Sequence, residues 1–311
     1  MSLSVKELIK IAERQLADAG VADAQIDAKE LYCFLMGYDK TALMMHWQDV
    51  LQDNQCEAYF ALIEKRAKRQ PLQHITGEQE FMGFPFKVNE HVLIPRQDTE
   101  TMVEDAIELL EKGTLRGGAY GRGKPLKGSA DILDLCCGSG AIGISLAKTF
   151  GKAKVVCTDV SPQALKTARE NASYNACKNI KFAESDMFEA PFFNGRFGKK
   201  KFDLIISNPP YIESEVIEGL EPEVKDHEPR LALDGGTDGL NFYRKIAQEA
   251  AAYLKKDGVL MMEIGCEQKD AVKEILRQTG EYERIIGLTD LTGRDRIVAA
   301  IKKKEEKKRG E

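Results

Sequence analysis

Apolar segments alternate with amphipathic segments along the last two thirds of the chain, and this order restricts the fold more than any other feature. The apolar segments are residues 131–136, 154–158, 180–183, 202–207, 257–264, 283–288 and 296–301. Strands that alternate with helices build a sheet covered by helices. We therefore expect an α/β domain, doubly wound and Rossmann-like with seven strands, in which a ligand binds at the carboxyl edge of the sheet.

The first 70 residues have a different pattern, that of a small helical bundle. Ser4-Val5-Lys6-Glu7 is a capping box, in which the serine hydroxyl and the glutamate carboxylate satisfy free N–H groups at a helix start. Further helices are expected over residues 26–38, 41–47 and 53–69, from their 3.6-residue apolar period.

Residues 71–96 lie between the bundle and the α/β domain and predict a hairpin connector. Gly77 and Gly83 interrupt short aromatic and β-branched segments, which are residues 80–82, 84–88 and 92–94. We expect four parts in all: a helical domain that docks the substrate (1–70), the connector (71–96), the catalytic domain (97–301) and a charged, solvated tail (302–311). Within the catalytic domain, residues 99–112 predict a helix, and the Gly- and Lys-rich residues 113–130 a mobile loop.

The charge of the chain limits the partners that it can bind, and its cysteine content indicates the cellular compartment. The net charge is −5 and the isoelectric point is about 5.7, which gives no basic footprint for a phosphate backbone. The seven cysteines are an odd number without the paired spacing of a zinc site or a disulfide framework. No apolar run approaches the length of a membrane span. We expect a cytoplasmic protein, with no bound metal and no membrane or direct nucleic-acid contact.

The segment from Asp131 to Gly143 is a strand followed by a glycine turn and a helix. Gly138, Gly140 and Gly143 match the dinucleotide pattern G-x-G-x-x-G, which is weak on its own. Asp134, just before the turn, would oppose a pyrophosphate but suits a ligand with an ammonium and a sulfonium group. This favours S-adenosylmethionine, although Asp134 could also be a structural residue of the turn.

Two further acidic residues follow the next two strands. Asp159 ends the second strand, where a carboxylate can accept hydrogen bonds from both ribose hydroxyls, a role that either cofactor class would use. Asp186 follows the third strand and can accept from an adenine amino group, while Met187 can pack on the ring. A polar turn with a core methionine is the alternative interpretation of this pair.

The tetrapeptide Asn208-Pro209-Pro210-Tyr211 stands at the carboxyl end of a buried strand and indicates the chemistry. Two prolines stiffen the loop and leave nearby carbonyls free to accept hydrogen bonds. An amide or arylamine nitrogen is a poor nucleophile because its lone pair is delocalised. The Asn208 Oδ1 atom and the Pro209 carbonyl could hold its two protons and stabilise positive charge in the transition state, with Tyr211 packed on the flat group. The alternative is a plain strand-ending turn.

These residues resemble the HemK/PrmC family of protein-(glutamine-N5) methyltransferases, which modify the Gly-Gly-Gln glutamine of peptide chain release factors. The resemblance covers nearly the whole chain. Its other motifs are Pro71-Leu-Gln-His-Ile-Thr-Gly77-Glu78, Leu93-Ile-Pro-Arg96-Gln-Asp-Thr-Glu100, Glu228-Pro-Arg-Leu-Ala-Leu-Asp234-Gly-Gly-Thr-Asp-Gly239 and Gly293-Arg-Asp-Arg296. The resemblance implies a helical N-terminal domain, a hairpin and a seven-stranded methyltransferase domain.

The resemblance also implies roles for individual residues. It assigns S-adenosylmethionine to the loop Cys136-Cys137-Gly138-Ser139-Gly140, the ribose to Asp159, the adenine to Asp186 and Met187, and the substrate to Asn208, Pro209, Pro210 and Tyr211. Two positions depart from the family pattern. Cys136 replaces the usual first glycine and would be strained if that position needs a positive φ. Met187 stands where the family often has an aromatic residue.

Several other interpretations stay open at this stage. An adenine-N6 nucleic-acid methyltransferase would face the same chemical problem and would need base flipping. A glutamine methyltransferase of a ribosomal protein would share the catalytic loop. A nonenzymatic adapter would bind S-adenosylmethionine without turnover. The adjacent cysteines Cys136 and Cys137 could indicate redox control or metal binding. We expect a monomeric enzyme that acts on release factors.

Overall fold

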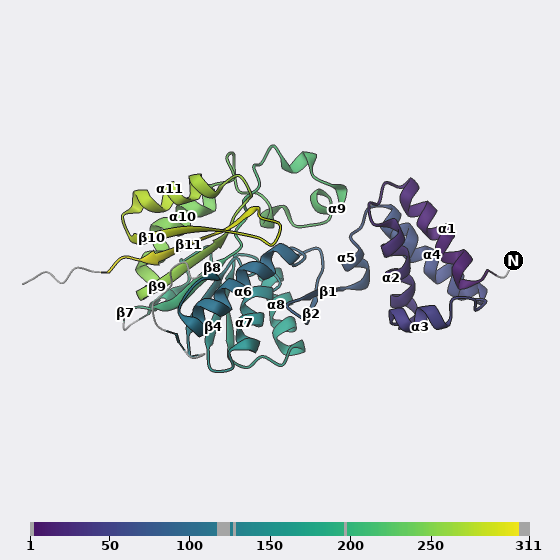
Figure 1. The fold of residues 1–311 in the computed structure, drawn as a ribbon, viewed down its shortest axis with the longest axis horizontal. Coiled ribbons are helices and arrows are strands. Elements are labelled where there is room, and N and C mark those ends of the chain that lie inside the picture. The colour runs from purple at the N-terminus through teal and green to yellow at the C-terminus, as the bar shows by residue number, and fades with distance from the viewer. Residues whose placement is uncertain (1–2, 117–124, 127–128, 196–197, 305–311) are drawn as a thin grey trace, which may run out of the picture. The chain divides into compact units, whose positions relative to one another are not determined.

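The structure is a computed structural model that describes residues 3–116, 125–126, 129–195 and 198–304 (Figure 1). It divides into two compact units. The first unit comprises Met1–Glu78 and Leu220–His227, and the second comprises Gln79–Gly219 and Glu228–Glu311. A short segment of the C-terminal half of the sequence is therefore part of the N-terminal unit. The domain boundaries expected above, at residues 70, 96 and 301, stay a prediction.

The first unit is a helical bundle with its own apolar core. Its helices are α1 (Val5–Asp18), α2 (Ala24–Met36), α3 (Lys40–Met45), α4 (Asp53–Ala67), α5 (Leu72–Thr76) and α9 (Pro222–Lys225). The predicted capping box is confirmed: the Ser4 N–H and hydroxyl donate to Glu7, and the Ser4 Oγ atom accepts from the Glu7 N–H. Leu8, Leu31 and Ile63 belong to the core that α1, α2 and α4 share.

Helix α9 is attached to the bundle by ion pairs. Arg66, on α4, contacts Asp27 on α2 at 2.6 Å and Glu223 on α9 at 2.8 Å. Arg69 contacts Glu223 at 2.6 Å and Glu221 at 2.8 Å. The side chains of Asp27 and Arg66 are each only 8% exposed, so this pair is buried.

The second unit is built on a seven-stranded sheet, which confirms the predicted fold class. The strand order is β10-β11-β9-β8-β3-β4-β5. The strands are β3 (Asp131–Leu135), β4 (Lys154–Asp159), β5 (Ile180–Glu184), β8 (Phe202–Ser207), β9 (Leu254–Glu263), β10 (Tyr282–Thr289) and β11 (Asp295–Lys302). Strands β9, β8, β3, β4 and β5 are parallel to their neighbours in that series, whereas β11 and β10 are antiparallel.

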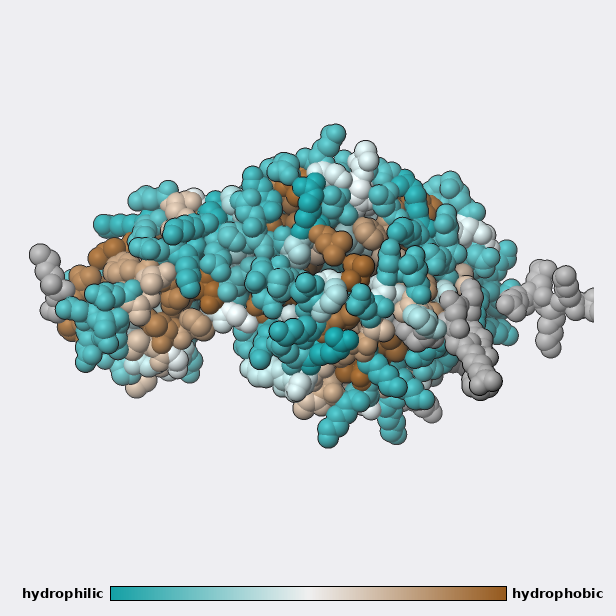
Figure 2. Space-filling model, turned by 180° about the vertical axis from the view of Figure 1, so that it is seen from behind, coloured by the Kyte–Doolittle hydropathy of each residue, from teal (hydrophilic) through white to brown (hydrophobic). Residues whose placement is uncertain are grey.

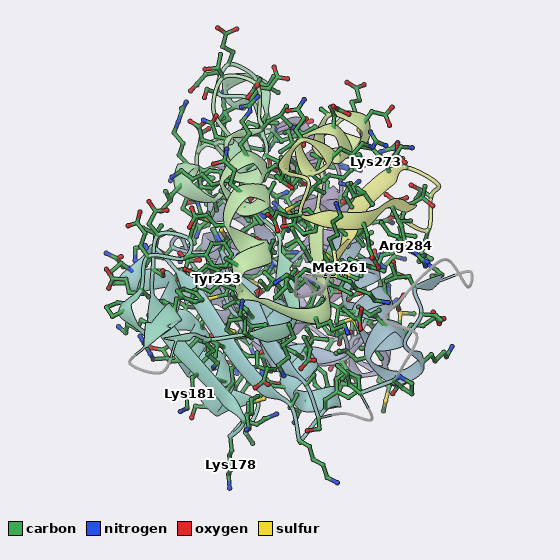
Figure 3. The ribbon with its side chains drawn as sticks, turned by 90° about the vertical axis from the view of Figure 1, so that its left-hand side faces the viewer. Lys178, Lys181, Tyr253, Met261, Lys273 and Arg284 are labelled. Carbon is green, nitrogen blue, oxygen red and sulfur yellow. The ribbon has the colours of Figure 1, made fainter. Side chains whose placement is uncertain are left out.

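Alternate residues of the central strands face two separate apolar cores. Ile132 and Leu204 pack in one core with α6 (Gln97–Lys112), α7 (Ala141–Thr149) and α8 (Pro162–Tyr174). Leu133 and Ile205 pack in the other with α10 (Asn241–Glu249) and α11 (Lys269–Thr279). Helices therefore cover both faces of the sheet (Figure 1). In Figure 3, Met261 lies within the sheet while Lys178 and Lys181 reach outward at one end of the unit.

The connector differs from its prediction. Strands β1 (Glu78–Phe81) and β2 (Phe84–Lys87) form the expected hairpin, but Leu72–Thr76 is a short helix that the prediction missed. Residues 92–94, the third of the connector's β-branched segments, do not form a strand. Val92 and Ile94 instead fill a small core with Val88 and Ala164, and the Ile94 N–H donates to the Glu228 carboxylate at 3.0 Å rather than to a strand.

Short elements complete the described part of the chain. A two-stranded pair, β6 (Asn194–Gly195) and β7 (Gly198–Lys199), precedes β8. Short 3₁₀ helices lie at Pro191–Phe193, Ile217–Gly219, Arg230–Ala232 and Ala250–Tyr253. Most of the predicted mobile loop (residues 117–124 and 127–128) and of the charged tail (305–311) lies outside the described residues. Within the described ranges no helix is long and apolar enough to cross a membrane, and the face drawn in Figure 2 is mostly hydrophilic.

Candidate active site

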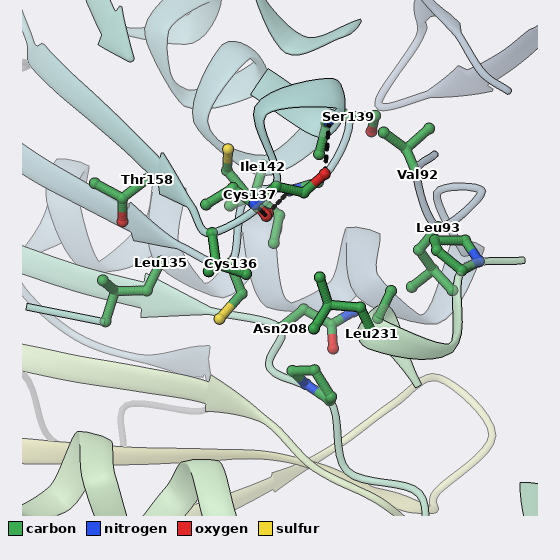
Figure 4. A pocket seen from close by; sticks show the side chains of 18 of the residues that line it. Val92, Leu93, Leu135, Cys136, Cys137, Ser139, Ile142, Thr158, Asn208 and Leu231 are labelled. Carbon is green, nitrogen blue, oxygen red and sulfur yellow. Dashed lines mark hydrogen bonds between the residues drawn. The ribbon is translucent and has the colours of Figure 1, made fainter. Parts of the chain in front are cut away.

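A pocket lies at the carboxyl edge of the parallel strands, as the fold predicts (Figure 4). Its wall is formed by the ends of four strands and the loops that follow them, together with the connector before α6. Its lining residues include Arg96, Thr99, Cys136, Cys137, Gly138, Ser139, Asp159, Ser161, Asp186, Met187, Asn208, Pro210 and Lys245. Segments far apart in the sequence thus meet around one space.

The loop after β3 turns sharply by using left-handed backbone conformations. Cys136 has φ 57°, Gly138 has φ 53° and Gly140 has φ 80°. A positive φ at Cys136 means that this non-glycine residue is strained, which was the conditional expectation for the missing first glycine. Gly140 forms the N-cap of α7, where an added Cβ would meet Ile144 Cδ1 at 2.9 Å, and it does not line the described pocket.

Asp159 joins the end of β4 to the glycine loop. Its Oδ2 atom accepts from the Gly138 N–H and its Oδ1 atom accepts from the Ser161 N–H, each at 2.9 Å. Burial raises the pKa of Asp159, and the hydrogen bonds from Ser161 and Gly138 oppose that rise. A carboxylate has about four acceptor positions, so Asp159 can still accept hydrogen bonds from a ligand in the pocket.

Asp134 is not part of the pocket wall, contrary to its expected contact with the ligand. It is fully buried, and its Oδ2 atom accepts from the Gly143 N–H at 2.9 Å. A Cβ at Gly143 would meet Cys157 Sγ at 2.3 Å and Asp134 Oδ2 at 2.9 Å, so glycine permits the close approach of α7. Burial raises the pKa of Asp134 to about 7. The carboxyl holds the loop from behind because strand alternation turns it away from the pocket.

Asp186 and Met187 both line the pocket, as predicted. Met187 has φ 48° and is buried, and its carbonyl accepts from the Ser185 hydroxyl at 2.8 Å. Lys245, on α10, lies 3.8 Å from the exposed Asp186 carboxylate. A carboxylate beside a buried thioether provides both a hydrogen-bond acceptor and an apolar surface for a planar heterocycle.

The four residues after β8 divide into two pairs. Asn208 and Pro210 line the pocket, whereas Pro209 and Tyr211 are not among its described lining residues. The Tyr211 ring packs on the second apolar core, and its hydroxyl donates to Glu263 Oε1 at 3.4 Å. A Cβ at Gly239 would meet the Tyr211 carbonyl oxygen at 2.4 Å, so the loop of residues 234–239 packs directly on Tyr211. The expected packing of Tyr211 on a substrate is thus not seen as a pocket contact.

The sequence interpretation gave no role to several residues of this site. Glu228 accepts from the Ile94 N–H and pairs with Arg96 at 2.5 Å, which holds the connector at the pocket. Thr99, Glu263 and Arg296 form a cluster behind Asn208 and Tyr211. Most of these residues lie in the segments that carry the family resemblance. Glu263 had a weaker signal, a charged residue near the end of an otherwise apolar strand.

The pocket contains the groups that a nucleoside ligand requires. The backbone of Gly138 and Ser139 lies beside Asp159, which suits ribose hydroxyls, and Asp186 with Met187 suits adenine. Asn208 lies at the same pocket, at the end of β8. A seven-stranded sheet of this order with such a pocket defines the class of S-adenosylmethionine-dependent methyltransferases.

Comparison with known proteins agrees and identifies the family. A model described as the PrmC N-terminal domain matches residues 7–77, and one described as a methyltransferase domain matches residues 126–309. The release factor glutamine methyltransferase of Geobacter sulfurreducens is 38% identical over 295 residues, which are 95% of either chain. That of Moorella thermoacetica is 37% identical over 304 residues, which are 97% of this chain and 100% of its own. The chain belongs to the release factor glutamine methyltransferase family, as its motifs predicted.

A solved structure of a release-factor-specific protein-(glutamine-N5) methyltransferase from Alicyclobacillus acidocaldarius is also similar. It is 26% identical, covers 70% of this chain and 100% of its own, and gives a TM-score of 0.39. As a member of the release factor glutamine methyltransferase family, the chain is a methyltransferase that uses S-adenosylmethionine as its methyl donor.

Proposed function

We propose that this enzyme methylates the side-chain amide nitrogen (N5) of the glutamine in the Gly-Gly-Gln motif of peptide chain release factors. The observation that carries the proposal is the near-complete coverage by relatives of that name, together with the match of residues 7–77 to the PrmC N-terminal domain. The position of Asn208 at the pocket wall, at the carboxyl end of β8, supports it.

The chain's own residues would act by orientation and by accepting hydrogen bonds. S-adenosylmethionine supplies an electrophilic methyl group when it is bound. Gly138, Ser139 and Asp159 would hold its ribose and methionine parts, and Asp186 and Met187 would hold its adenine. The Asn208 Oδ1 atom and the Pro209 carbonyl would accept the two amide protons of the substrate glutamine and turn the nitrogen lone pair toward the pocket. Such preorganised acceptors stabilise the positive charge that grows on nitrogen in the transition state.

We propose that the first unit docks the protein substrate, since one glutamine side chain offers too little surface for selectivity. Met44 is 67% exposed and Met45 is 77% exposed on this unit, and both suit an adaptable apolar contact. Met44→Glu with Met45→Glu should raise KM for intact release factor without changing S-adenosylmethionine affinity. Leu291→Glu is the matched control, because Leu291 is 83% exposed on the second unit. An equal effect of both changes would contradict the docking role.

We also propose that the enzyme acts as a cytoplasmic monomer on protein and not on nucleic acid. All seven cysteines are free, which suits a reducing compartment. The net charge of −5 offers no general attraction for a phosphate backbone. Light scattering at working concentration tests the monomer, and a larger particle would refute it.

The deciding experiment is transfer of labelled methyl groups from S-adenosylmethionine to three acceptors. These are release factor, a release factor variant with Gly-Gly-Ala in place of Gly-Gly-Gln, and duplex DNA. We expect label on the unmodified release factor alone. Asn208→Ala should slow transfer by about 10²- to 10³-fold, the scale of losing one transition-state acceptor. Asn54→Ala, an exposed asparagine on α4, is the control. Label on DNA would indicate an adenine methyltransferase, and cofactor binding without transfer an adapter.

A further inference from the structure

The end of β9 places a buried carboxylate behind the loop that holds the substrate. Glu263 is only 2% exposed. Its Oε1 atom accepts from the Tyr211 hydroxyl at 3.4 Å, while its Oε2 atom has no hydrogen-bond partner among the described atoms. A buried polar atom without a partner costs stability, so its retention calls for a functional reason.

Thr99 lies between this carboxylate and the proposed catalytic amide. It is 4% exposed and lines the pocket, and its Oγ1 atom accepts from Asn208 Nδ2 at 3.3 Å. Burial raises the pKa of Glu263 to about 7, and the Thr99 hydroxyl and then Arg296 act on the same carboxyl in the opposite direction. Thr99 is therefore hydrogen-bonded to Asn208, and its hydroxyl lowers the pKa of Glu263.

We propose that Glu263 is a positioning residue that sets the direction of hydrogen bonding through Thr99 to Asn208. Above its pKa of about 7, Glu263 is ionised and can only accept, so it attracts the single hydroxyl proton of Thr99. The Thr99 oxygen then presents lone pairs to Asn208, which must turn its NH₂ group toward Thr99. The Asn208 Oδ1 atom is left to accept from the substrate amide. This role rests on the proposed function, because that function requires Oδ1 as the acceptor.

The same carboxylate also attaches to the other end of the loop. The Tyr211 hydroxyl donates to Glu263, and the Tyr211 carbonyl accepts from Gln268 Nε2 at 2.9 Å. Glu263 thus orients both ends of the tetrapeptide: it accepts directly from Tyr211, the last residue, and acts on Asn208, the first residue, through Thr99. A glutamine at position 263 would keep the shape but could donate as well as accept, so the direction of both contacts would be lost.

The charges that act on Glu263 come from two elements. Arg296 on β11 favours the ionised form, and Asp98 on α6 opposes it. Arg296 is itself engaged by Asp98 at 2.9 Å and by Asp290 at 3.3 Å. The terminal arginine of the Gly293-Arg-Asp-Arg296 motif therefore supports the carboxylate from behind rather than entering the pocket, and it is not among the pocket's described lining residues.

The test uses the full chain with Glu263→Gln and follows methyl transfer to release factor. We expect kcat to fall by about 10²-fold, the scale for misplacing a catalytic group. KM for release factor and the Kd for S-adenosylmethionine should be nearly unchanged, and the melting temperature should not fall. A merely structural role would lower the melting temperature and leave kcat per folded molecule intact. Wild-type turnover by Glu263→Gln would overturn the proposal.

Changes at Thr99 test the path independently of whether Glu263→Gln folds. Thr99→Val removes the hydroxyl without changing the side-chain shape much and should slow turnover as Glu263→Gln does. Thr99→Ser should restore most of that loss. The double variant Glu263→Gln with Thr99→Val should be little slower than either single variant, because both break one path. Multiplicative losses, or a Thr99→Ser enzyme as slow as Thr99→Val, would overturn the path. If the wild-type enzyme transfers no methyl to release factor, the proposed function fails and this role with it.

Discussion

Two sets of buried charges, one in each unit of the molecule, are held in different ways. In the first unit, Asp27 and Arg66 are both buried and lie 2.6 Å apart, and Arg66 also contacts Glu223 at 2.8 Å. In the second unit, Asp134 and Glu263 are buried, and each has one carboxylate oxygen without a partner among the described atoms. Burial raises the pKa of both carboxyls to about 7.

The difference separates structural from functional use of charge. Paired charges in the first unit specify how α2, α4 and α9 meet, and the pairing offsets the loss of hydration. The unpaired carboxylates of the second unit lower its stability but lie behind the glycine loop and the substrate loop. Perturbed carboxyls of this kind cluster at functional sites, where stability is given up for activity.

The largest expected loss of stability follows from breaking the buried pair of Asp27 and Arg66 in the first unit. Arg66→Ala would leave Asp27 buried without its partner, and breaking a buried pair costs about 3–5 kcal/mol. The free energy of unfolding of the first unit, measured by amide hydrogen exchange in α2 and α4, should fall by that amount. Arg14→Ala, which removes an exposed arginine from α1, is the control. Equal effects of the two changes would erase the comparison between the units.

Glu263→Gln in the second unit is expected to raise the free energy of unfolding, whereas Arg66→Ala lowers it. The folded-state pKa of about 7 lies above the usual 4.5, so the folded protein binds more protons than the unfolded chain between these values. Wild-type stability should therefore decrease as pH rises from about 4.5 to about 7. Glutamine does not titrate, so the variant's advantage should grow over this range, to at most about 3 kcal/mol. Denaturant unfolding at pH 5 and pH 8 checks this, and a pH-independent difference would contradict it.

A smaller loss of stability is expected from a substitution where α7 approaches Asp134. Gly143→Ala would place a Cβ against Cys157 Sγ and Asp134 Oδ2, and overpacking of this kind costs about 1–3 kcal/mol. The shift should also disturb the glycine loop and weaken binding of S-adenosylmethionine, as measured by calorimetry. Gly151→Ala is the matched control, because nothing lies within 4 Å of its added Cβ. Unchanged affinity in Gly143→Ala would show that Asp134 does not shape the loop.

The smallest effect concerns backbone strain in the same loop. Cys136 has φ 57°, a conformation that costs a non-glycine residue about 1–2 kcal/mol. Cys136→Gly should relieve this strain and raise the melting temperature slightly. Cys136→Ala keeps the Cβ and removes only the thiol, so it should not. If both changes shift the melting temperature equally, the thiol's packing matters more than φ.

Local patterns predicted most of the fold and several of the residues that line the pocket. The strand periods and the capping box at Ser4 depend on neighbouring residues, and both were confirmed. Asp159, Asp186 and Asn208 were found because each follows a strand that ends at the same sheet edge. The β-branched segment at residues 92–94 forms no strand, and the Ile94 N–H donates instead to a distant carboxylate, that of Glu228.

The sequence by itself determined the alternating α/β order, the helical first unit, the family and the edge of the sheet where the ligand binds. Periodicity and strand ends are local properties, and the motifs are read directly from the residues. Only the tertiary structure decided that Asp134 faces α7, that Leu220–His227 joins the first unit, and that Thr99 and Glu263 stand behind Asn208 and Tyr211. These facts depend on side-chain direction and on contacts between residues far apart in the sequence, from 52 positions for Tyr211 and Glu263 to 157 for Arg66 and Glu223, which no local pattern records.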